Sequence, residues 1–409
     1  MPDTKEFNFY NKPVLLFVYF NIIKNSCKLR FSNFTDPLKK LHIVSFNNPY
    51  PPDYGGVIDV YYKIKALKES GVSVVLHVFE YNRPSAAELN EICDVVYYYP
   101  RKTGLFSQLS ILPYIVKSRR SIALLQNISG DEYPVLFEGL HCCHYLNHPL
   151  LKNKVKLVRM HNIEHEYYSF LSKSALNLKT RLYYFAESLK LKLFENVLKF
   201  ADHILAISIS DKEYFNLKYG KAIHIGAFHS NISISSKEGK GNFILMHGNL
   251  EVEENESAIL YCIRNIFNLI DFPVVIAGKN PGNLLKTEII ENKNIVLVEN
   301  PSETEMDRLQ HDAHIHLCYT FQASGLKLKL LNSLFKGRFV VANPLMTEGS
   351  GLHEIVEVGK SDRELVEIIT KLVKTNFDSD SISKREEILK AYNNKQNADK
   401  ISMLLTSEL

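Results

Sequence analysis

Short apolar runs alternate with helical stretches along most of the chain, and this alternation constrains the fold more than any other feature of the sequence. Runs of five to eight apolar residues are typical of strands buried on both faces, which occur in parallel sheets that helices cover on both sides. The runs form two sets, at 41–46, 72–79, 94–99, 134–139, 155–160 and 203–208, and then at 243–248, 273–278, 294–300, 313–319 and 339–343.

The first set opens with a strand, a glycine-containing loop, a helix and a second strand. The loop at 47–56 is dense in turn formers, and an apolar stripe with the period of a helix follows at 57–70, closed by Gly71 as a C-cap. This order is the opening unit of a doubly wound α/β domain. We therefore predict two Rossmann-like doubly wound parallel-sheet domains over 41–228 and 243–385, a polar linker over 229–242 and a terminal helix over 386–409.

Composition excludes several other classes. The chain has 409 residues, of which 45% are hydrophobic and 23% charged, which excludes a disordered chain and a small disulfide scaffold. The net charge of +4 is below that of a dedicated nucleic-acid binder. Six cysteines without a CxxC pair favour a reduced, cytoplasmic setting. The apolar run 13–23 is too short to cross a bilayer and lacks the flanks of a signal peptide, so 1–40 is an extension of unknown role.

Candidate ligand-binding residues follow the strands, because open α/β sheets bind ligands beyond the carboxyl ends of their strands. Glycines or lysines at these positions suit a phosphate, which a helix N-terminus or an ammonium group can hold, although tight turns and solvated surface lysines explain the same residues. The candidates are Gly55 and Gly56 after the first strand, His161 after 155–160, His247 and Asn249 at the end of the run 243–248, Lys279 after 273–278, and Ser324, Gly325, Lys327, Lys329 and Asn332 in the stretch 322–337.

Three patterns admit competing interpretations. His161, Glu164 and His165 spell the H-x-x-E-H motif of inverted zinc peptidases, which requires both histidines on one helix, and local hydrogen bonding is the alternative. The run 141–144, His-Cys-Cys-His, lacks the paired spacing of a zinc site, so packing is favoured and no metal is predicted. The predicted helix 178–200 mixes lysines and arginine with leucines and aromatics, which fits either an anionic membrane surface or a solvated basic face over a core.

Several stretches taken together resemble the GT-B glycosyltransferases, specifically the family 4 type of bacterial polysaccharide and glycolipid synthesis. The resemblance covers about residues 41 to 360 in collinear order and leaves residues 1–40 outside it. The matching stretches are PYPPDYGG, FEGLH, RMHNIEHEYY, ADHILAIS, MHGNLEVEEN, IAGKNP and SGLKLKLLNSLFKGRFVVAN.

The resemblance implies transfer of a sugar from a nucleotide-sugar to an acceptor hydroxyl in a cleft between the two domains, with retention of configuration and without an obligatory metal. The second domain would bind the nucleotide and the first the acceptor. Gly55 and Gly56 would lie near the phosphates, His161 beside the transferred sugar, and Lys279 near the diphosphate. His161, Lys279 and Lys327 are the catalytic candidates that this implies.

The chain also departs from the family pattern. Ser324 and Asn332 stand where the family has the two glutamates of its E-x7-E motif, and Asn249 and Glu254 or Asn255 stand where it has arginine and lysine. The phosphate clamp would then come from Lys279, Lys327 and Lys329, which keep positive charge near the leaving group.

We therefore expect a metal-independent hexosyl- or mannosyl-type transferase that uses a GDP- or UDP-sugar and a glycan or lipid-linked acceptor. It would act in the cytoplasm or peripherally on the inner face of the cell membrane, in surface polysaccharide assembly. Two alternatives remain: a nucleotide-sugar 2-epimerase of the same fold, and a catalytically silent protein that binds sugar nucleotides or polysaccharide.

Overall fold

The computed structural model describes residues 39–104, 107, 110–175, 177–322 and 328–406. Its first sheet has seven strands, all paired in parallel, in the order β3-β2-β1-β4-β5-β6-β7. The strands are β1 (Lys39–Ser45), β2 (Val72–Glu80), β3 (Val95–Pro100), β4 (Val135–Glu138), β5 (Lys156–Met160), β6 (His203–Ala206) and β7 (Ala222–His224).

The second sheet has six strands in the order β10-β9-β8-β11-β12-β13, again with only parallel pairs among the described residues. The strands are β8 (Ile244–Asn249), β9 (Val274–Lys279), β10 (Ile295–Glu299), β11 (Ile315–Cys318), β12 (Phe339–Ala342) and β13 (Glu357–Val358). In both sheets the order reverses beside the first strand, which is the topology of a doubly wound α/β domain. The predicted fold class is therefore confirmed.

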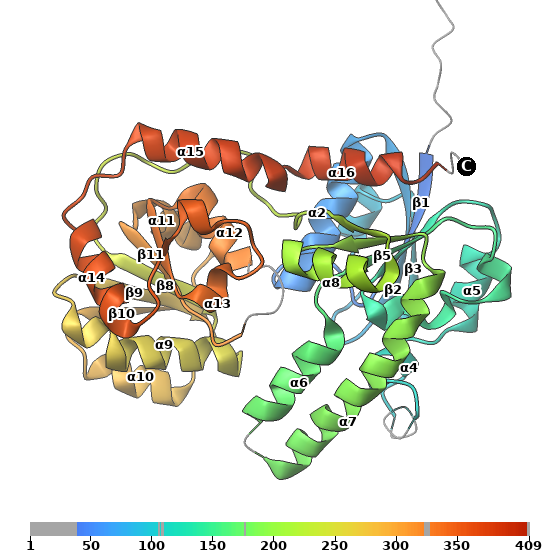
Figure 1. The fold of residues 1–409 in the computed structure, drawn as a ribbon, viewed down its shortest axis with the longest axis horizontal. Helices are drawn as coiled ribbons and strands as arrows, with labels where there is room; N and C mark the ends of the chain where they lie inside the picture. The colour runs from blue at the N-terminus through green and yellow to red at the C-terminus, as the bar shows by residue number, and fades with distance from the viewer. Residues whose placement is uncertain (1–38, 105–106, 108–109, 176, 323–327, 407–409) are drawn as a thin grey trace, which may run out of the picture. The chain divides into compact units, whose positions relative to one another are not determined.

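Helices connect the strands of each sheet (Figure 1). In the first lobe they are α2 (Gly55–Glu69), α4 (Tyr114–Lys117), α5 (Ile122–Ile128), α6 (Glu164–Ser174), α7 (Leu178–Phe194) and α8 (Ile209–Tyr219). In the second they are α9 (Glu253–Asn265), α10 (Asn283–Ile290), α11 (Glu303–Asp312), α12 (Leu328–Lys336), α13 (Pro344–Thr347) and α14 (Asp362–Leu372), followed by α15 (Ser379–Leu389) and α16 (Asn394–Met403).

The C-terminal stretch differs from the single terminal helix predicted for 386–409. Helix α15 ends at Leu389, a short 3-10 turn follows, and α16 begins at Asn394, whose neighbour Asn393 caps it through its side chain. Ala398, Ile401 and Leu405 lie in the same apolar core as Leu41 of the first sheet. The chain therefore returns from the second lobe to the first, where the apolar face of α16 packs against α2.

The polar segment 229–242 contains neither a helix nor a strand of a sheet, but it is held at several points. His229 and Asn231 are buried, and the Ser236 hydroxyl donates to the Gly337 carbonyl at 2.7 Å. Its role as a linker stays a prediction.

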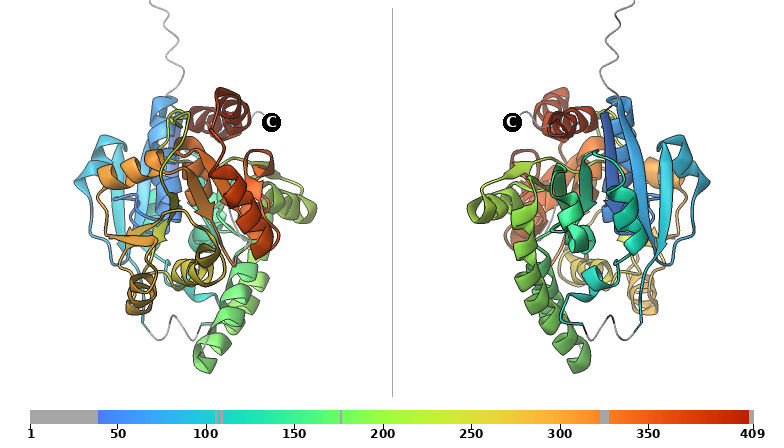
Figure 2. Two further views of the ribbon diagram at one scale, coloured as in Figure 1. Left: turned by 90° about the vertical axis from the view of Figure 1, so that its left-hand side faces the viewer. Right: turned by 90° about the vertical axis from the view of Figure 1, so that its right-hand side faces the viewer.

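Helices α6 and α7 form a hairpin that projects away from the first sheet (Figures 1 and 2). Helix α7 continues beyond Phe194 as a 3-10 turn over Glu195–Phe200, so the helical stretch predicted for 178–200 is present with a tighter end. Among the described residues, no helix is both long enough and apolar enough to span a bilayer.

Candidate functional site

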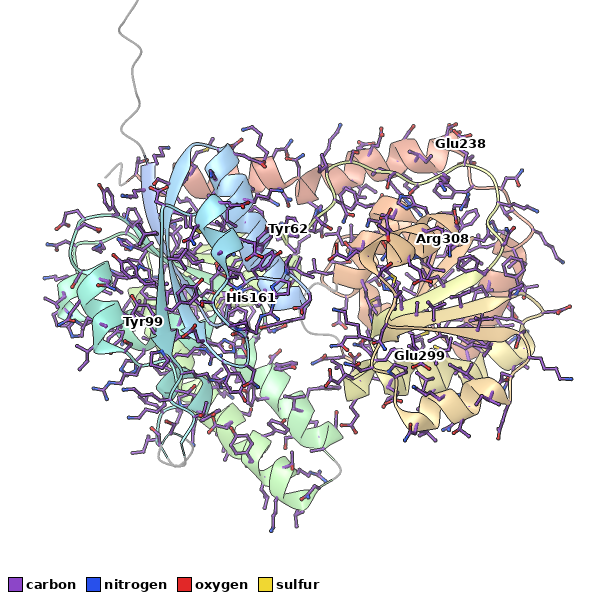
Figure 3. The ribbon with its side chains drawn as sticks, turned by 180° about the vertical axis from the view of Figure 1, so that it is seen from behind. Tyr62, Tyr99, His161, Glu238, Glu299 and Arg308 are labelled. Atoms are coloured by element: carbon purple, nitrogen blue, oxygen red, sulfur yellow. The ribbon has the colours of Figure 1, made fainter. Side chains whose placement is uncertain are left out.

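A cavity of about 890 Å³ lies at the carboxyl ends of strands β8 and β9. Residues of both lobes line it, and Figure 3 shows one of them, Tyr62, on its helix in the first lobe. Its wall comprises Pro52, Asp53, Ile58 and Tyr62 of the first lobe, Ser230, Asn231, Ile232, Ser233 and Ser235 of the connecting segment, and His247, Gly248, Asn249, Gly278, Lys279, Pro301, Ser302, Glu303, Thr304, Met306, Asp307, Gln310, His311, Asn332 and Lys336 of the second lobe.

Lys279 and His247 offer this cavity polar atoms that the described residues leave free. Lys279 is exposed at the end of β9, and no hydrogen bond or ion pair of its ammonium group is found within the described parts of the chain. The His247 Nε2 atom is buried and has no hydrogen-bond partner among those same residues. Burial, with Lys329 and Lys336 nearby, lowers the pKa of His247 to about 4, so at neutral pH its ring is uncharged. An ammonium and a free imidazole nitrogen suit an anionic, hydrogen-bonding ligand.

Gly278 allows the two strand ends to approach each other closely. A Cβ atom at this position would lie 2.1 Å from the Gly248 carbonyl oxygen and 2.7 Å from Leu250 Cγ. Only glycine therefore fits, and the carboxyl ends of β8 and β9 carry His247 and Lys279 to the same wall.

The side chain of Lys329 lies close to Asn255, one of the two positions at which the resemblance places the family's lysine. Its Nζ atom donates to Asn255 Oδ1 at 3.2 Å and to the Tyr319 carbonyl at 3.3 Å. Lys329 lies on α12. Its predicted place in the first turn depends on residues 323–327, which are outside the described residues, so it stays a prediction. Lys329 does not line the cavity, whereas His247 does. The positive charge of Lys329 helps to lower the pKa of His247.

Asn332 and Lys336 reach the cavity from the next turns of α12. The side-chain oxygen of Asn332 accepts a hydrogen bond from Asn231 Nδ2 at 2.8 Å, so it is partly occupied. Lys336 forms an ion pair with Asp307 at 2.7 Å. Helix α12 thus contributes two groups to the site: the amide of Asn332 and the ammonium group of Lys336, whose charge is paired with Asp307.

The remaining predicted residues of this stretch, Ser324, Gly325 and Lys327, lie outside the described residues. Their proposed contacts with phosphate and sugar stay predictions.

Gly55 and Gly56 form the start of α2, and Tyr54 separates them from the cavity residues Pro52 and Asp53. No side chain caps this helix, and its first turn has no acidic residue, which leaves its N-H groups favourable for an anion. A Cβ atom on Gly56 would lie 2.7 Å from the Phe46 ring, and one on Gly55 would lie 3.9 Å from Leu328 at the start of α12. Neither glycine is itself in the cavity wall.

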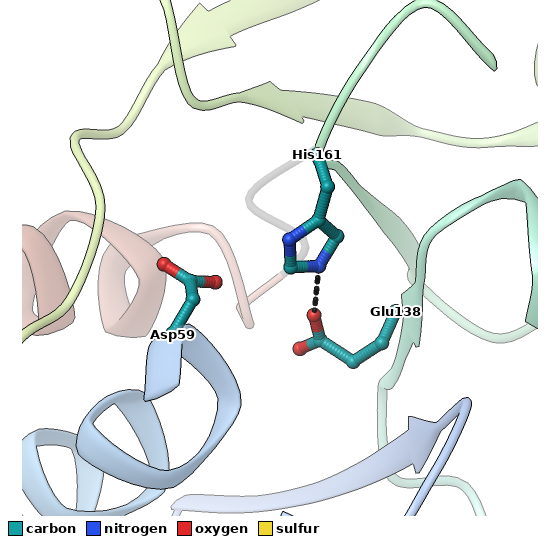
Figure 4. Close-up of side chains that lie close together, drawn as sticks. All are labelled: Asp59, Glu138 and His161. Carbon is teal, nitrogen blue, oxygen red and sulfur yellow. Dashed lines mark hydrogen bonds and ion pairs between the residues drawn. The ribbon is translucent and has the colours of Figure 1, made fainter. Parts of the chain in front are cut away.

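His161 follows β5 and bonds to Glu138, the last residue of β4 (Figure 4). The two side chains meet at 3.1 Å between His161 Nε2 and Glu138 Oε2. Burial opposes ionisation of Glu138, but Lys63 and His161 hold its pKa below the usual range, so the carboxylate accepts and Nε2 carries the proton. When the imidazole is neutral, its Nδ1 atom can therefore accept a hydrogen bond. His161 does not line the cavity.

Glu138 belongs to a buried network of ion pairs. Lys63 Nζ lies 2.7 Å from Glu138 Oε1 and 2.8 Å from Asp59 Oδ2, and Arg159 makes two hydrogen bonds to Asp59, at 2.8 and 3.1 Å. All four side chains are fully or almost fully buried. Burial alone would raise the pKa of Asp59, but Arg159 and Lys63 hold it far below its usual value. Two buried carboxylates and two buried cations therefore neutralise one another.

Asp59, Glu138 and His161 each present a ligand atom, and these atoms lie within 4.8 Å of one another. Such a set resembles a divalent-metal site, but Lys63 already bridges the two carboxylates. A metal ion would have to displace this ammonium at a large cost in buried charge. The three residues are better described as an anchored histidine with its supporting network.

The zinc-peptidase interpretation of 161–165 is wrong. His161 lies before α6 and bonds to Glu138, whereas His165 on α6 bonds to the Tyr214 hydroxyl at 3.0 Å.

The packing interpretation of 141–144 is confirmed for the cysteines, because Cys142 and Cys143 are buried in the core of the first lobe, where burial raises the pKa of both thiols.

Sequence reasoning named Glu164 only as part of the zinc-peptidase pattern, and it missed Ser302 at the start of α11. Glu164 is buried, and burial raises its pKa to about 8, so it is mostly protonated at neutral pH. Arg119 opposes this rise and Asp211 adds to it, while the Nδ1 atom of His141 lies 3.8 Å from the Glu164 carboxyl group. Ser302 caps α11 by accepting from Glu305 N at 3.2 Å and lines the cavity. The other candidates were selected because they lie at the carboxyl ends of strands. Ser302 follows the carboxyl end of β10, so the same criterion could have identified it.

Comparisons with known proteins agree with the fold. No family model matches the chain. A Klebsiella pneumoniae protein described as an uncharacterized 44.6 kDa protein in the cps region is 27% identical over 333 residues, which is 77% of this chain and 85% of that protein.

Solved structures of glycosyltransferases superpose on most of the chain. Anabaena HepE, solved with UDP and glucose, gives a TM-score of 0.61 at 11% identity over 90% of this chain and 100% of its own. A mutant of Staphylococcus aureus TarM, in complex with UDP and sugar ligands, gives 0.61 at 10% identity over the same shares. WaaG, a glycosyltransferase involved in lipopolysaccharide biosynthesis, gives 0.58 at 10% identity, again over 90% and 100%. The shared architecture is the GT-B fold.

Proposed function

We propose that this chain, which has the GT-B fold, is a retaining glycosyltransferase of the family 4 type. It would move a sugar from a nucleotide-sugar to an acceptor hydroxyl of a glycan or glycolipid in surface polysaccharide assembly. The observation that carries the proposal is the cavity in which the exposed Lys279 and the unpartnered, neutral His247 meet at the carboxyl ends of β8 and β9. The relative from a cps region and the UDP bound to HepE and TarM support it.

In this proposal the site lowers the barrier by stabilising the leaving group. As the bond between the anomeric carbon and the phosphate oxygen breaks, negative charge develops on the nucleoside diphosphate. Lys279, together with Lys329 behind His247, would neutralise this charge without an obligatory metal. The acceptor hydroxyl attacks from the same face and loses its proton to the departing phosphate. His161, held by Glu138, would bond to the transferred sugar.

A ligand panel tests this proposal. UDP, GDP, UDP-glucose, UDP-N-acetylglucosamine and GDP-mannose are titrated against the purified full chain by differential scanning fluorimetry and isothermal calorimetry. At one hundred times its Kd, a nucleotide that binds only the folded state stabilises it by about 2.7 kcal/mol. We expect such a shift with UDP or a UDP-sugar, with GDP-sugars as the second choice. If none of these compounds binds, the transferase and the epimerase are both excluded.

Lys279→Ala is expected to weaken binding of the nucleoside diphosphate roughly tenfold or more, because it removes a charge-assisted bond to phosphate. Lys329→Ala should weaken it less, since Lys329 lies behind the wall and is already bonded to Asn255. The measurement is the Kd for UDP compared with that for uridine, which lacks the phosphates. Lys374→Ala, an exposed lysine of the second lobe outside the cavity wall, is the control. Equal Kd values for Lys279→Ala and Lys374→Ala would refute the assigned role.

Replacing His161 should affect turnover more than donor binding. His161→Ala is expected to lower kcat roughly 100-fold, as removal of one preorganised polar group commonly does, with donor Kd nearly unchanged. Glu138→Gln should lower kcat less, because the glutamine can still bond to Nε2 through its amide oxygen. Steady-state kinetics with donor and acceptor varied separately measures both effects, and His353→Gln on the exposed surface is the control. A change in donor Kd with kcat intact would assign His161 to donor binding.

The same assays separate the alternatives. An epimerase would convert UDP-N-acetylglucosamine without an acceptor, and a silent binding protein would bind a nucleotide without consuming it. Asn332 is the observation that favours the silent protein. Its side-chain oxygen is already bonded to Asn231, and it stands where the family has the glutamate that the resemblance assigns to the ribose.

A further inference from the structure

The outward face of α7 is apolar, although α7 belongs to a hairpin at the surface of the first lobe (Figures 1 and 2). Five large apolar side chains on it are between 50% and 74% exposed: Leu178, Leu182, Phe185, Leu189 and Leu193. They are spaced four, three, four and four residues apart, so they form a single stripe along the helix. The opposite side of α7 packs inward through Leu191 and Glu187. We call these five residues the α7 stripe.

Basic residues border the α7 stripe on both sides. At 100° per residue, Lys179 lies on one edge, and Arg181 and Lys192 lie on the other. All three are exposed, and no ion pair of any of them is found within the described residues. Positive charge on both edges of the stripe is therefore left without a protein partner.

Acidic residues are absent from this outward face because the two that the helical stretch contains point inward. Glu187 Oε2 accepts from Tyr114 N at 2.6 Å, and Glu195 Oε1 accepts from the Tyr214 hydroxyl at 2.9 Å. Both carboxylates are buried. The exposed sector thus has apolar and basic side chains and no negative charge.

We propose that the α7 stripe and its basic borders dock the protein on an anionic lipid surface. An amphipathic helix of this composition lies in the plane of the interface, with its apolar face among the acyl chains and its lysines and arginines at the headgroups. A second copy of the chain is a poorer partner. A symmetric contact would bring the same basic edges together, and the face holds no carboxylate to pair with them. Lipid phosphates supply the missing negative charge.

The inference rests on the proposed function for its meaning, since it names the surface at which the protein would bind a lipid-linked acceptor. The observations behind it concern α7 alone. Of the two interpretations of the basic stretch in 178–200, the exposure of the side chains in the α7 stripe supports the anionic membrane surface. A solvated basic face over a core would turn the leucines inward, whereas here five large apolar side chains point outward.

Vesicle co-sedimentation of the full chain tests this proposal. The vesicles are pure phosphatidylcholine, or phosphatidylcholine with about one quarter phosphatidylglycerol, in about 0.1 M salt. We expect binding to be at least roughly tenfold stronger with phosphatidylglycerol present. The double variant Phe185→Gln, Leu189→Gln should reduce binding roughly tenfold or more. The triple variant Lys179→Gln, Arg181→Gln, Lys192→Gln should remove most of the dependence on phosphatidylglycerol.

The matched control is Leu284→Gln, Ile290→Gln on α10, where two exposed apolar residues lie outside the α7 stripe, and it should bind vesicles as the unmodified chain does. The proposal is overturned if the unmodified chain does not bind anionic vesicles, or if the α7 double variant binds them as well as the α10 control. It is also overturned if light scattering shows a dimer that the double variant abolishes while vesicle binding persists. The UDP titration, repeated on the α7 variant, keeps the two proposals separate: unchanged UDP binding leaves the transferase proposal intact.

Discussion

Replacing Asp59 by alanine is expected to lower the free energy of unfolding by about 3–5 kcal/mol, which is the cost of leaving buried charges without their partner. Asp59 accepts hydrogen bonds from Lys63, from Arg159 and, at 2.9 Å, from the backbone N-H of Phe228. Without it, the hydrogen bonds that Arg159 keeps among the described residues go to the carbonyl oxygens of Ile225 and Gly226. Such a loss is a large part of the total stability of a typical domain.

Urea-induced unfolding followed by far-UV circular dichroism measures this effect. The control is Glu367→Ala, which breaks the exposed ion pair with Arg363 and should cost less than about 1 kcal/mol. If Asp59→Ala cannot be recovered folded, Asp59→Asn, which keeps part of the hydrogen bonding, gives the same comparison with a smaller loss. Equal midpoints for the Asp59 variants and the Glu367 control would contradict the account of the network.

Acidification from pH 7.5 to pH 5.0 is expected to destabilise the protein by several kcal/mol. Burial, reinforced by His42 for His77 and by His247 for His316, lowers the pKa of both histidines to about 3. An unfolded histidine has a pKa near 6.5, so between the two values the unfolded chain binds protons that the folded chain cannot. Their contribution is therefore complete above about pH 6.5 and is lost as the pH falls toward 3. Each histidine accounts for about 2 kcal/mol at pH 5.

The measurement is the urea midpoint as a function of pH. His316→Gln should be less stable at pH 7.5, because His316 bonds to the Gln310 carbonyl at 2.8 Å and to Ser333 at 3.1 Å, but it should lose about 2 kcal/mol less on acidification. His353→Gln, at an exposed histidine, should keep the original pH dependence. A stability that is constant between pH 7.5 and 5.0 would show that the buried histidines do not control it.

The strands were predictable because each is a local apolar run. All eleven predicted runs overlap a strand, and the ends agree within a few residues, as for 72–79 and β2 (Val72–Glu80). Strands β7 and β13 were missed, since they are short, lie at the edges of their sheets and have little apolar sequence of their own. The break between α15 and α16 was missed because a polar helix pair and a single polar helix have similar local patterns.

The candidate site was predictable only in part. Residues at the carboxyl ends of strands, such as His247 and Lys279, were found because their position follows from the fold class. The contact of Lys329 with Asn255, the bond between His161 and Glu138, and the outward direction of the α7 stripe were not predictable. Each depends on which face of an element another element covers.

The sequence by itself determined two doubly wound α/β domains and the positions of most strand-end residues, because apolar periodicity and turn formers act over a few neighbouring residues. Only the tertiary structure decided which side chains meet. Lys63, Glu138 and Arg159 come from distant segments, yet the parallel order of the first sheet and the packing of α2 place them in one buried network. Such contacts depend on sheet order and helix packing, which join residues far apart in the chain and leave no local pattern in it.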